Sequence, residues 1–243
     1  NLTRIDLEDP RAQLLRAEIW LAEGREAEAW AALDLAAAAG LPEALYRRAI
    51  ERSDQPQLAD SVRADLRAAF EKAGDEAVGH LARGVLALAL GHADVAGELL
   101  TEAIVRDPTL RDAYRYRAEV RTSLGEDLRG ALADCDRARR LGIDDPALLF
   151  TRGLCLLKLR MYSLAIEDFA AYAATGGEST ASSIYNIACA HALMRNREEA
   201  LGWLGRAVEA GFSDIGHARL DPDLDSIRED PRFEKILRSS SSD

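Results

Sequence analysis

The chain has 243 residues, of which 48% are hydrophobic and only 6% aromatic, and its formal net charge is −11. This acidic balance disfavours binding to nucleic acid and to anionic membrane surfaces, because both require a positively charged face. No apolar run reaches the roughly 18 residues that indicate a membrane span, and no signal peptide is evident. The three cysteines, Cys135, Cys155 and Cys189, are too widely spaced for a disulfide framework. They fit a reducing compartment, so we expect a cytoplasmic protein unless a targeting segment lies upstream.

The first predicted element begins after residues 1–9, which we interpret as a lead segment or the end of an earlier helix. Ala, Leu, Arg and Glu dominate the composition and favour helix, and no sustained two-residue alternation predicts a strand. From Pro10 onwards, small residues occur at Ala17, Ala29 and Ala36, at spacings of twelve and then seven residues. Gly24 interrupts the helical pattern between them. This pattern predicts two helices that lie close together where the small residues meet.

Later segments repeat this spacing. A degenerate copy begins at Pro42, with Ala49 in the first small position and a long break at residues 53–57. Further copies begin near residues 77, 111, 146 and 181. In these four copies the small positions hold, in order, Gly84, Ala96 and Ala103; Ala118, Ala131 and Ala138; Gly153, Ala165 and Tyr172; and Ala188, Ala200 and Ala207. Tyr172 replaces the last small residue of the copy that begins near residue 146.

The copy at residues 181–212 resembles the tetratricopeptide-repeat family. That family has a 34-residue period with a small residue at its eighth position and alanines at its twentieth and twenty-seventh positions. Ala188, Ala200 and Ala207 match, whereas Ile184 and His191 replace the aromatic residues of the fourth and eleventh positions. The resemblance implies an all-α fold, a right-handed superhelical solenoid of about six helix hairpins over residues 10–212.

The C-terminal part predicts a cap over residues 213–238 and a disordered tail over residues 239–243. Five prolines follow aspartate, and each pair is expected to start a helix with a carboxylate cap. Within residues 221–237 we expect one or two short helices whose polar residues, including Asp223 and Arg228, face water. The expected buried stripe is Leu224, Ile227, Phe233, Ile236 and Leu237. This end resembles the closing segment of bacterial tetratricopeptide arrays, including those attached to eukaryotic-type serine/threonine kinases.

The same resemblance implies a concave groove lined by the first helix of each hairpin. Carried onto this chain, the groove positions give the following candidate partner-binding residues: Leu81, Val85, Leu88, Arg115, Tyr116, Glu119, Phe150, Leu154, Leu157, Tyr185, Asn186 and Cys189. Residues 146–159 are apolar on nearly every side. We therefore expect part of that helix to be core, with Phe150, Leu154 and Leu157 forming an apolar contact patch for a partner.

Sequence patterns of catalysis are absent from this chain. It has no glycine-rich phosphate loop, no Cys-x-x-Cys and no His-Glu-x-x-His. Cys189 and His191 are two residues apart on a helix and would point away from each other, so we predict no metal there. The acidic string Asp221, Asp223 and Asp225 lacks the glycine and distal glutamate of a calcium loop, and we interpret it as capping. We predict no cofactor.

The predicted function is a non-catalytic interaction scaffold whose groove binds a peptide or a partner protein. An amphipathic helix or an extended apolar peptide fits the apolar groove positions better than the chaperone-tail carboxylate clamp known in one subfamily. The alternative is a regulatory or substrate-recruiting arm of a larger enzyme, such as a bacterial serine/threonine kinase. A third possibility is self-association through the apolar helix.

Overall fold

The computed structural model describes residues 9–239, so the expectations for residues 1–8 and 240–243 lie outside the described residues. Within residues 9–239 the chain is helical and contains no strand, which confirms the predicted all-α class. None of the described helices is both long enough and apolar enough to cross a membrane. The chain divides into two compact units, residues 1–120 and 121–243, and each is described by itself.

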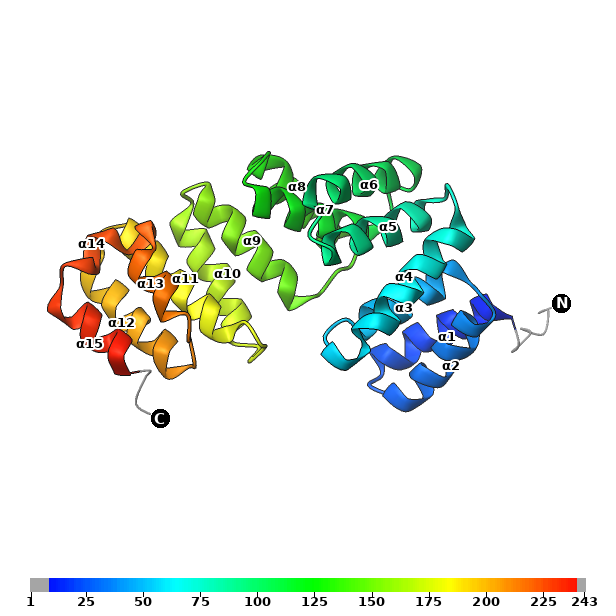
Figure 1. Ribbon diagram of the computed structural model, residues 1–243, viewed down its shortest axis with the longest axis horizontal. Coiled ribbons are helices and arrows are strands. Elements are labelled where there is room, and N and C mark those ends of the chain that lie inside the picture. Colours follow the sequence, from blue (N-terminus) through cyan, green and yellow to red (C-terminus); the bar gives the residue numbers. More distant parts are fainter. Residues whose placement is uncertain (1–8, 240–243) are drawn as a thin grey trace. The chain divides into compact units, whose positions relative to one another are not determined.

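Unit 1 is built from successive pairs of helices (Figure 1). The pairs are α1 (Pro10–Ala22) with α2 (Glu26–Ala38), α3 (Pro42–Glu51) with α4 (Ala59–Ala73), and α5 (Ala77–Ala89) with α6 (Ala93–Arg106). A short 3-10 helix, η1 (Pro56–Leu58), occupies the long break between α3 and α4. The next helix, α7 (Arg111–Leu124), begins in unit 1, and the division between the units falls inside it.

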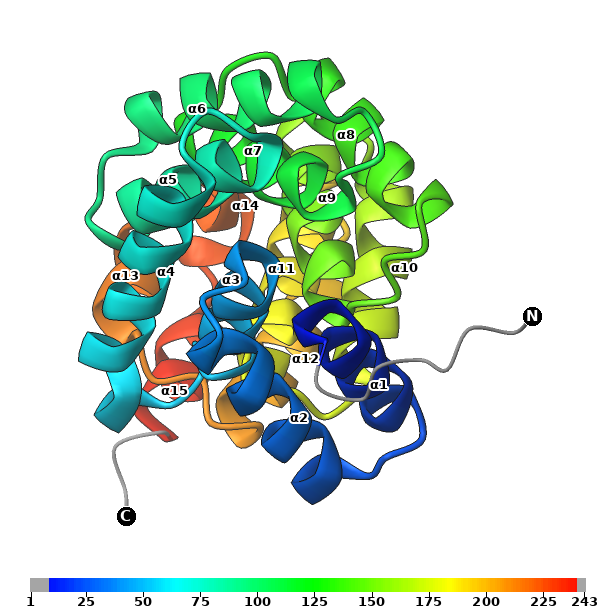
Figure 2. The same cartoon turned by 90° about the vertical axis from the view of Figure 1, so that its right-hand side faces the viewer.

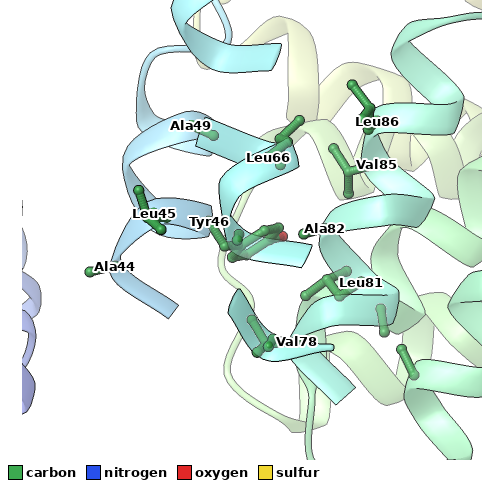
Figure 3. Close-up of a cluster of buried hydrophobic side chains, with 14 of the residues drawn as sticks. Ala44, Leu45, Tyr46, Ala49, Leu66, Val78, Leu81, Ala82, Val85 and Leu86 are labelled. Atoms are coloured by element: carbon green, nitrogen blue, oxygen red, sulfur yellow. The ribbon is translucent and has the colours of Figure 1, made fainter. Parts of the chain in front are cut away.

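The predicted small residues of unit 1 are buried in the packing between its helices. Ala17, Ala29, Ala36, Ala49, Ala69, Ala96 and Ala103 are at most 1% exposed. A Cβ atom on Gly84 would lie 3.0 Å from the Leu100 side chain of α6, which leaves no room for a larger residue. Figure 3 shows the adjoining core, in which side chains of α3, α4 and α5 meet around Tyr46, Leu66 and Leu81.

Unit 2 continues with helix pairs and ends in short elements (Figure 2). Its long helices are α8 (Leu128–Arg140), α9 (Pro146–Lys158), α10 (Tyr162–Ala173), α11 (Thr180–Leu193) and α12 (Arg197–Glu209). The short elements are α13 (Ile215–Leu220), η2 (Pro222–Leu224), α14 (Asp225–Arg228) and α15 (Pro231–Ser239). Helices α9 and α10, and α11 and α12, pack as antiparallel neighbours.

The short C-terminal elements cover the last helix pair. Leu224, Ile227, Phe233 and Leu237 are at most 1% exposed and join the core of α11 and α12, whereas Ile236 is only partly buried. The sequence did not predict α13, and Ser239 ends α15 instead of starting the expected tail. Asp223 and Arg228 were expected to face water, but both are half-buried. The Arg228 guanidinium donates to the main-chain oxygen of Asp221 at 2.7 Å.

Four of the five aspartate–proline pairs start helices as predicted. The Asp9, Asp145, Asp221 and Asp230 side chains accept hydrogen bonds from main-chain N–H groups two residues onward, at 2.8–3.0 Å. The prediction is wrong for Asp107, which ends α6. Its carboxylate accepts from the N–H and hydroxyl of Thr109, so it closes a turn ahead of α7.

Buried ion pairs between the two helices of a hairpin were not predicted from the sequence. In each one, an arginine of the first helix reaches an aspartate of the second that is 4–7% exposed. The pairs are Arg48 with Asp65, Arg121 with Asp134, and Arg152 with Asp168, at 2.7–2.8 Å. Arg48 and Arg152 bind both carboxylate oxygens, which fixes the angle between the helices as well as the charge balance.

Candidate functional site

A concave pocket of about 510 Å³ lies in unit 2 between α9, α11 and the C-terminal elements, and we call it the α11 pocket. Its apolar lining comes from Leu154 and Leu157 of α9, Tyr162 of α10 and Leu193 of α11. Its polar lining includes Lys158, Asn186, His217, Asp221 and Asp223. Apolar walls with a few polar groups are typical of a binding site for a small molecule or a peptide segment.

Asn186 is a polar group of the α11 pocket that the fold leaves unused. Its side-chain amide makes no hydrogen bond to any described residue. Lys158, by contrast, donates to the main-chain oxygen of Thr122 at 2.7 Å and is therefore held by the protein itself. An amide has both a donor and an acceptor, so Asn186 can pair with the main chain of a bound peptide.

Tyr185 anchors the C-terminal elements beside this pocket. Its ring stacks on Phe212 with centroids 4.2 Å apart, and its hydroxyl donates to Asp221 Oδ2 at 2.6 Å. His217 Nε2 lies 3.3 Å from the same oxygen. Burial raises the pKa of the Tyr185 hydroxyl, and the neighbouring Cys189 and Asp221 raise it further, so the tyrosine stays a donor.

Three groups of the metal-ligand type meet at the same place. The Cys189 sulfur and the carboxylate oxygens of Asp221 and Asp223 lie within 4.8 Å of one another. Both oxygens of Asp221 already stabilise the fold, because Oδ1 accepts from the Asp223 N–H and Oδ2 from Tyr185. The capping interpretation of Asp221 is therefore confirmed. Burial, together with Asp221 and Asp223, raises the pKa of the Cys189 thiol, which keeps it protonated and unreactive.

Replacing Asp223 by Asn is expected to raise the melting temperature near neutral pH. Burial, and then the charge of Asp221, raise the pKa of the Asp223 carboxyl above its ordinary value. A carboxyl whose pKa is raised by folding favours the folded state at low pH, and this contribution is lost as the pH rises through the folded pKa. The amide side chain of the variant carries no charge, so the variant loses no stability at this position as the pH rises. The hydrogen bond from the main-chain N–H of residue 223 to Asp221 is kept, because it does not involve the side chain.

Thermal melts across the acidic-to-neutral range test this prediction. The gain should be full above the folded pKa of Asp223 and should vanish below about pH 3, where the carboxyl is neutral in both states. Glu229→Gln is the matched control, since Glu229 is exposed and follows α14 directly. A melting temperature for Asp223→Asn that is unchanged or lower at neutral pH would contradict the prediction.

A second pocket, of about 560 Å³, lies in unit 1, and we call it the α3 pocket. Its apolar lining includes Leu14 of α1, Val78 of α5 and Leu110. Its acidic lining residues are Glu18, Glu43, Glu76, Asp107 and Asp112, and its basic ones are Arg47 and Arg111. The Tyr46 hydroxyl donates to Asp112 at 3.0 Å, and burial raises the Tyr46 pKa well above its ordinary value, so this bond persists.

Four of the twelve predicted groove residues line one pocket. Leu154, Leu157, Tyr185 and Asn186 line the α11 pocket. Arg115 lies over the ring of the buried Tyr116, Leu88 is half-buried, and Glu119 is exposed. None of the six unit 1 residues named above lines the α3 pocket, although Asp112, which holds a groove position in the copy that begins at Arg111, does.

Several groove predictions need correction because the side chains belong to the core. Leu81 is 0% exposed and Cys189 is 1% exposed, so neither presents a surface to a partner. Val85 is also buried within the unit 1 core. Phe150, expected in an apolar contact patch, packs its ring against Phe169 and Tyr172, at centroid distances of 5.8 and 5.5 Å. Leu157 is buried in that cluster as well, and Leu154 is partly buried beside it.

Sequence reasoning missed the α3 pocket, although the signal was present. The groove residues named above all come from the copies that begin near residue 77 and later. In the tetratricopeptide repeat the groove positions include the second, fifth, sixth and ninth. In the copies that begin at Pro10 and Pro42, these positions include the following α3-pocket residues: Leu14, Glu18, Glu43, Tyr46 and Arg47. Because three of these five residues are charged, the positions form no apolar stripe in the sequence.

The two-helix hairpins that pack through small residues, together with pockets on their first helices, define a helical-repeat protein of the α-solenoid class. Solved tetratricopeptide-repeat proteins share this architecture, and this chain has the tetratricopeptide-repeat fold. The chain aligns with YrrB, a tetratricopeptide-repeat protein with an unusual peptide-binding site, at a TM-score of 0.55 and 22% identity, over 74% of this chain and 93% of that one.

Two further solved structures give the same result. The Cut9–Hcn1 hetero-tetramer of the APC/C matches at a TM-score of 0.63 and 14% identity, over 97% of this chain and 43% of that one. A thermophilic tetratricopeptide-repeat protein of Thermus thermophilus matches at a TM-score of 0.53 and 17% identity, over 82% of this chain and 98% of that one. Identities this low show the fold alone.

Sequence comparison reaches a shorter segment. A chloroplastic protein of Arabidopsis thaliana is 28% identical over 88 residues, which is 35% of this chain. The match spans 26% of that protein's own length, about a quarter of it. No family model matches the chain.

Proposed function

We propose that this chain is a non-catalytic interaction scaffold that binds a peptide, or an extended segment of a partner protein, in the α11 pocket. The observation that carries the proposal is that Leu154, Leu157, Tyr185 and Asn186 line one pocket of about 510 Å³. Leu157 and Tyr185 are buried in its walls, and Leu154 and Asn186 are half-buried. This volume lies within the ~300–1,000 Å³ that is usual for ligand pockets.

The chemistry of the pocket favours a peptide with an apolar side chain. Leu154 and Leu193 are only half-buried, so an apolar group of the partner would gain burial against them. Asn186 supplies a free amide to the peptide main chain, which any sequence can use. The unusual peptide-binding site of YrrB supports the same mode of use for a fold of this kind.

Replacing Asn186 by Ala is expected to weaken peptide binding about tenfold, because the peptide amide would lose its partner on entering the pocket. Peptides are first selected from a phage-displayed random library on the immobilised protein. Their dissociation constants are then measured by fluorescence anisotropy. The melting temperature should stay unchanged, since the Asn186 side chain bonds to no described residue.

Ser163→Ala is the matched control, because Ser163 is an exposed residue of α10 outside the pocket. Leu193→Glu places a charge on the apolar lining and should abolish binding of the selected apolar peptides. Selection of no peptide at all would overturn the proposed function. Peptides that bind both pocket variants as tightly as the unchanged protein would also overturn it.

The alternative function, a regulatory or substrate-recruiting arm of a larger enzyme, uses the same pocket and stays a prediction. It rests on the C-terminal segment that resembles the end of kinase-attached arrays. The complete reading frame of the gene would decide it. Self-association also stays a prediction, and light scattering over a range of protein concentrations tests it.

A further inference from the structure

We propose that the α3 pocket binds a lysine or arginine side chain of a partner peptide. The inference extends the proposed function to a second pocket and rests on it. It assigns a chemical class of partner that the α11 pocket alone does not specify.

The charge of the α3 pocket is the first argument. Five carboxyl groups line it against two guanidinium groups, an excess of three negative charges. Of the Arg47 guanidinium, Nη2 lies 2.7 Å from Glu51, which does not line the pocket, while Nε is buried without a hydrogen-bond partner. Like charges that gather in one concavity raise its negative potential, and a cation is attracted there.

The unused carboxylates are the second argument. Glu18, Glu43 and Glu76 make no ion pair with any described residue. They come from α1, from the first turn of α3 and from the residue before α5, so three separate elements direct acidic side chains to one pocket. The Oε2 atom of Glu43 is buried without a hydrogen-bond partner. A buried acceptor without a donor is costly, and an incoming ammonium or guanidinium group would satisfy it.

The shape and polarity of the pocket select the occupant. Leu14, Val78 and Leu110 give it apolar walls, which suit the methylene stem of a lysine or arginine, while the carboxylates suit the charged head. A pocket of about 560 Å³ is large enough for such a side chain with its neighbouring main chain. A bare metal ion would leave the apolar walls unused, so a basic peptide side chain fits both parts of the lining.

The test compares peptides selected by three proteins from the same random library. The pocket variant carries Glu18→Gln, Glu43→Gln and Glu76→Gln. The control variant carries Glu26→Gln, Glu71→Gln and Glu98→Gln, which remove the same charge from exposed positions of unit 1 outside the pocket. Peptides selected by the unchanged protein should be enriched in lysine and arginine, and the control variant should keep that enrichment. The pocket variant should lose it.

Binding constants sharpen the comparison. A selected basic peptide should bind the pocket variant about tenfold more weakly, and replacing its basic residue by Gln should have a similar effect on the unchanged protein. Added salt should weaken the basic peptide more than its Gln counterpart. Peptides without basic enrichment would overturn this inference and leave the proposed function intact, whereas the absence of any selected peptide would overturn both. An equal loss in the pocket and control variants would also overturn it, because overall charge would then explain the binding.

Discussion

Replacing Gly153 by Arg is expected to lower the free energy of unfolding by about 3 kcal/mol or more. A Cβ atom at this position would lie 2.8 Å from Cε1 and 2.9 Å from Cδ1 of Phe169. The Phe169 ring is 0% exposed and packs against the Phe150 ring, so it cannot move aside to make room for a larger residue at position 153. A larger side chain must therefore separate α9 from α10.

Denaturant unfolding followed by circular dichroism measures this effect, and a pair of alanine variants provides the control. Gly153→Ala should destabilise the protein, because its new methyl group meets the Phe169 ring. Gly202→Ala should stabilise it by up to about 1 kcal/mol, since Gly202 is an exposed position of α12 with no atom near its Cβ direction. Equal stability of Gly153→Arg and the unchanged protein would mean that α9 and α10 do not meet at this position.

Replacing Arg152 by Ala is expected to cost about 3–5 kcal/mol, because it leaves the Asp168 carboxylate buried without its partner. Asp168 is 4% exposed, and both of its oxygens accept from Arg152 at 2.7 Å. Among the described residues no other side chain donates to this carboxylate, so the charge would have to stay unpaired or take up a proton. The Arg152 side chain, in turn, is only 20% exposed, and its loss also removes packing between α9 and α10.

The double variant Arg152→Leu with Asp168→Leu separates two contributions to the free energy of unfolding. One is the cost of leaving Asp168 unpaired, and the other is the net stabilisation by the ion pair. Removing both charges should recover most of the lost stability, because a buried ion pair contributes little beyond an apolar pair of similar size. Arg25→Ala is the surface control, since Arg25 and Glu28 form an exposed pair and should matter little. A double variant as unstable as Arg152→Ala would show that Arg152 acts through packing.

The pocket residues show the limit of sequence reasoning most clearly. Leu81 and Cys189 occupy register positions assigned to a groove, yet both are core residues. For Cys189 the reason lies in the start of η2, which places Asp221 beside the thiol at 3.8 Å. That contact joins residues 32 positions apart in the chain, and no local periodicity encodes it. Phe150 likewise became a core residue, because Phe169 and Tyr172 of α10 reach its ring.

The pairing of charged side chains could not be predicted from the sequence either. The sequence shows that the chain is acidic, but it does not show which carboxylates find arginines and which do not. Asp65 and Asp168 are neutralised by partners 17 and 16 residues away, across a hairpin. Glu18, Glu43 and Glu76 come from three elements and meet without an ion-pair partner among the described residues in the α3 pocket. These outcomes depend on how neighbouring helices are rotated about their axes, which spacing alone does not set.

The sequence by itself determined that this protein is all-α and built from helix hairpins. Small residues at spacings of twelve and seven, aspartate–proline caps and helical apolar stripes are local signals, and helix formation and close approach depend mainly on local residues. Only the tertiary structure decided which groove positions stay open, how the C-terminal elements cover α11 and α12, and which charges are paired. Burial and ion pairing are properties of three-dimensional neighbours, and those neighbours come from segments that the chain brings together only when it folds.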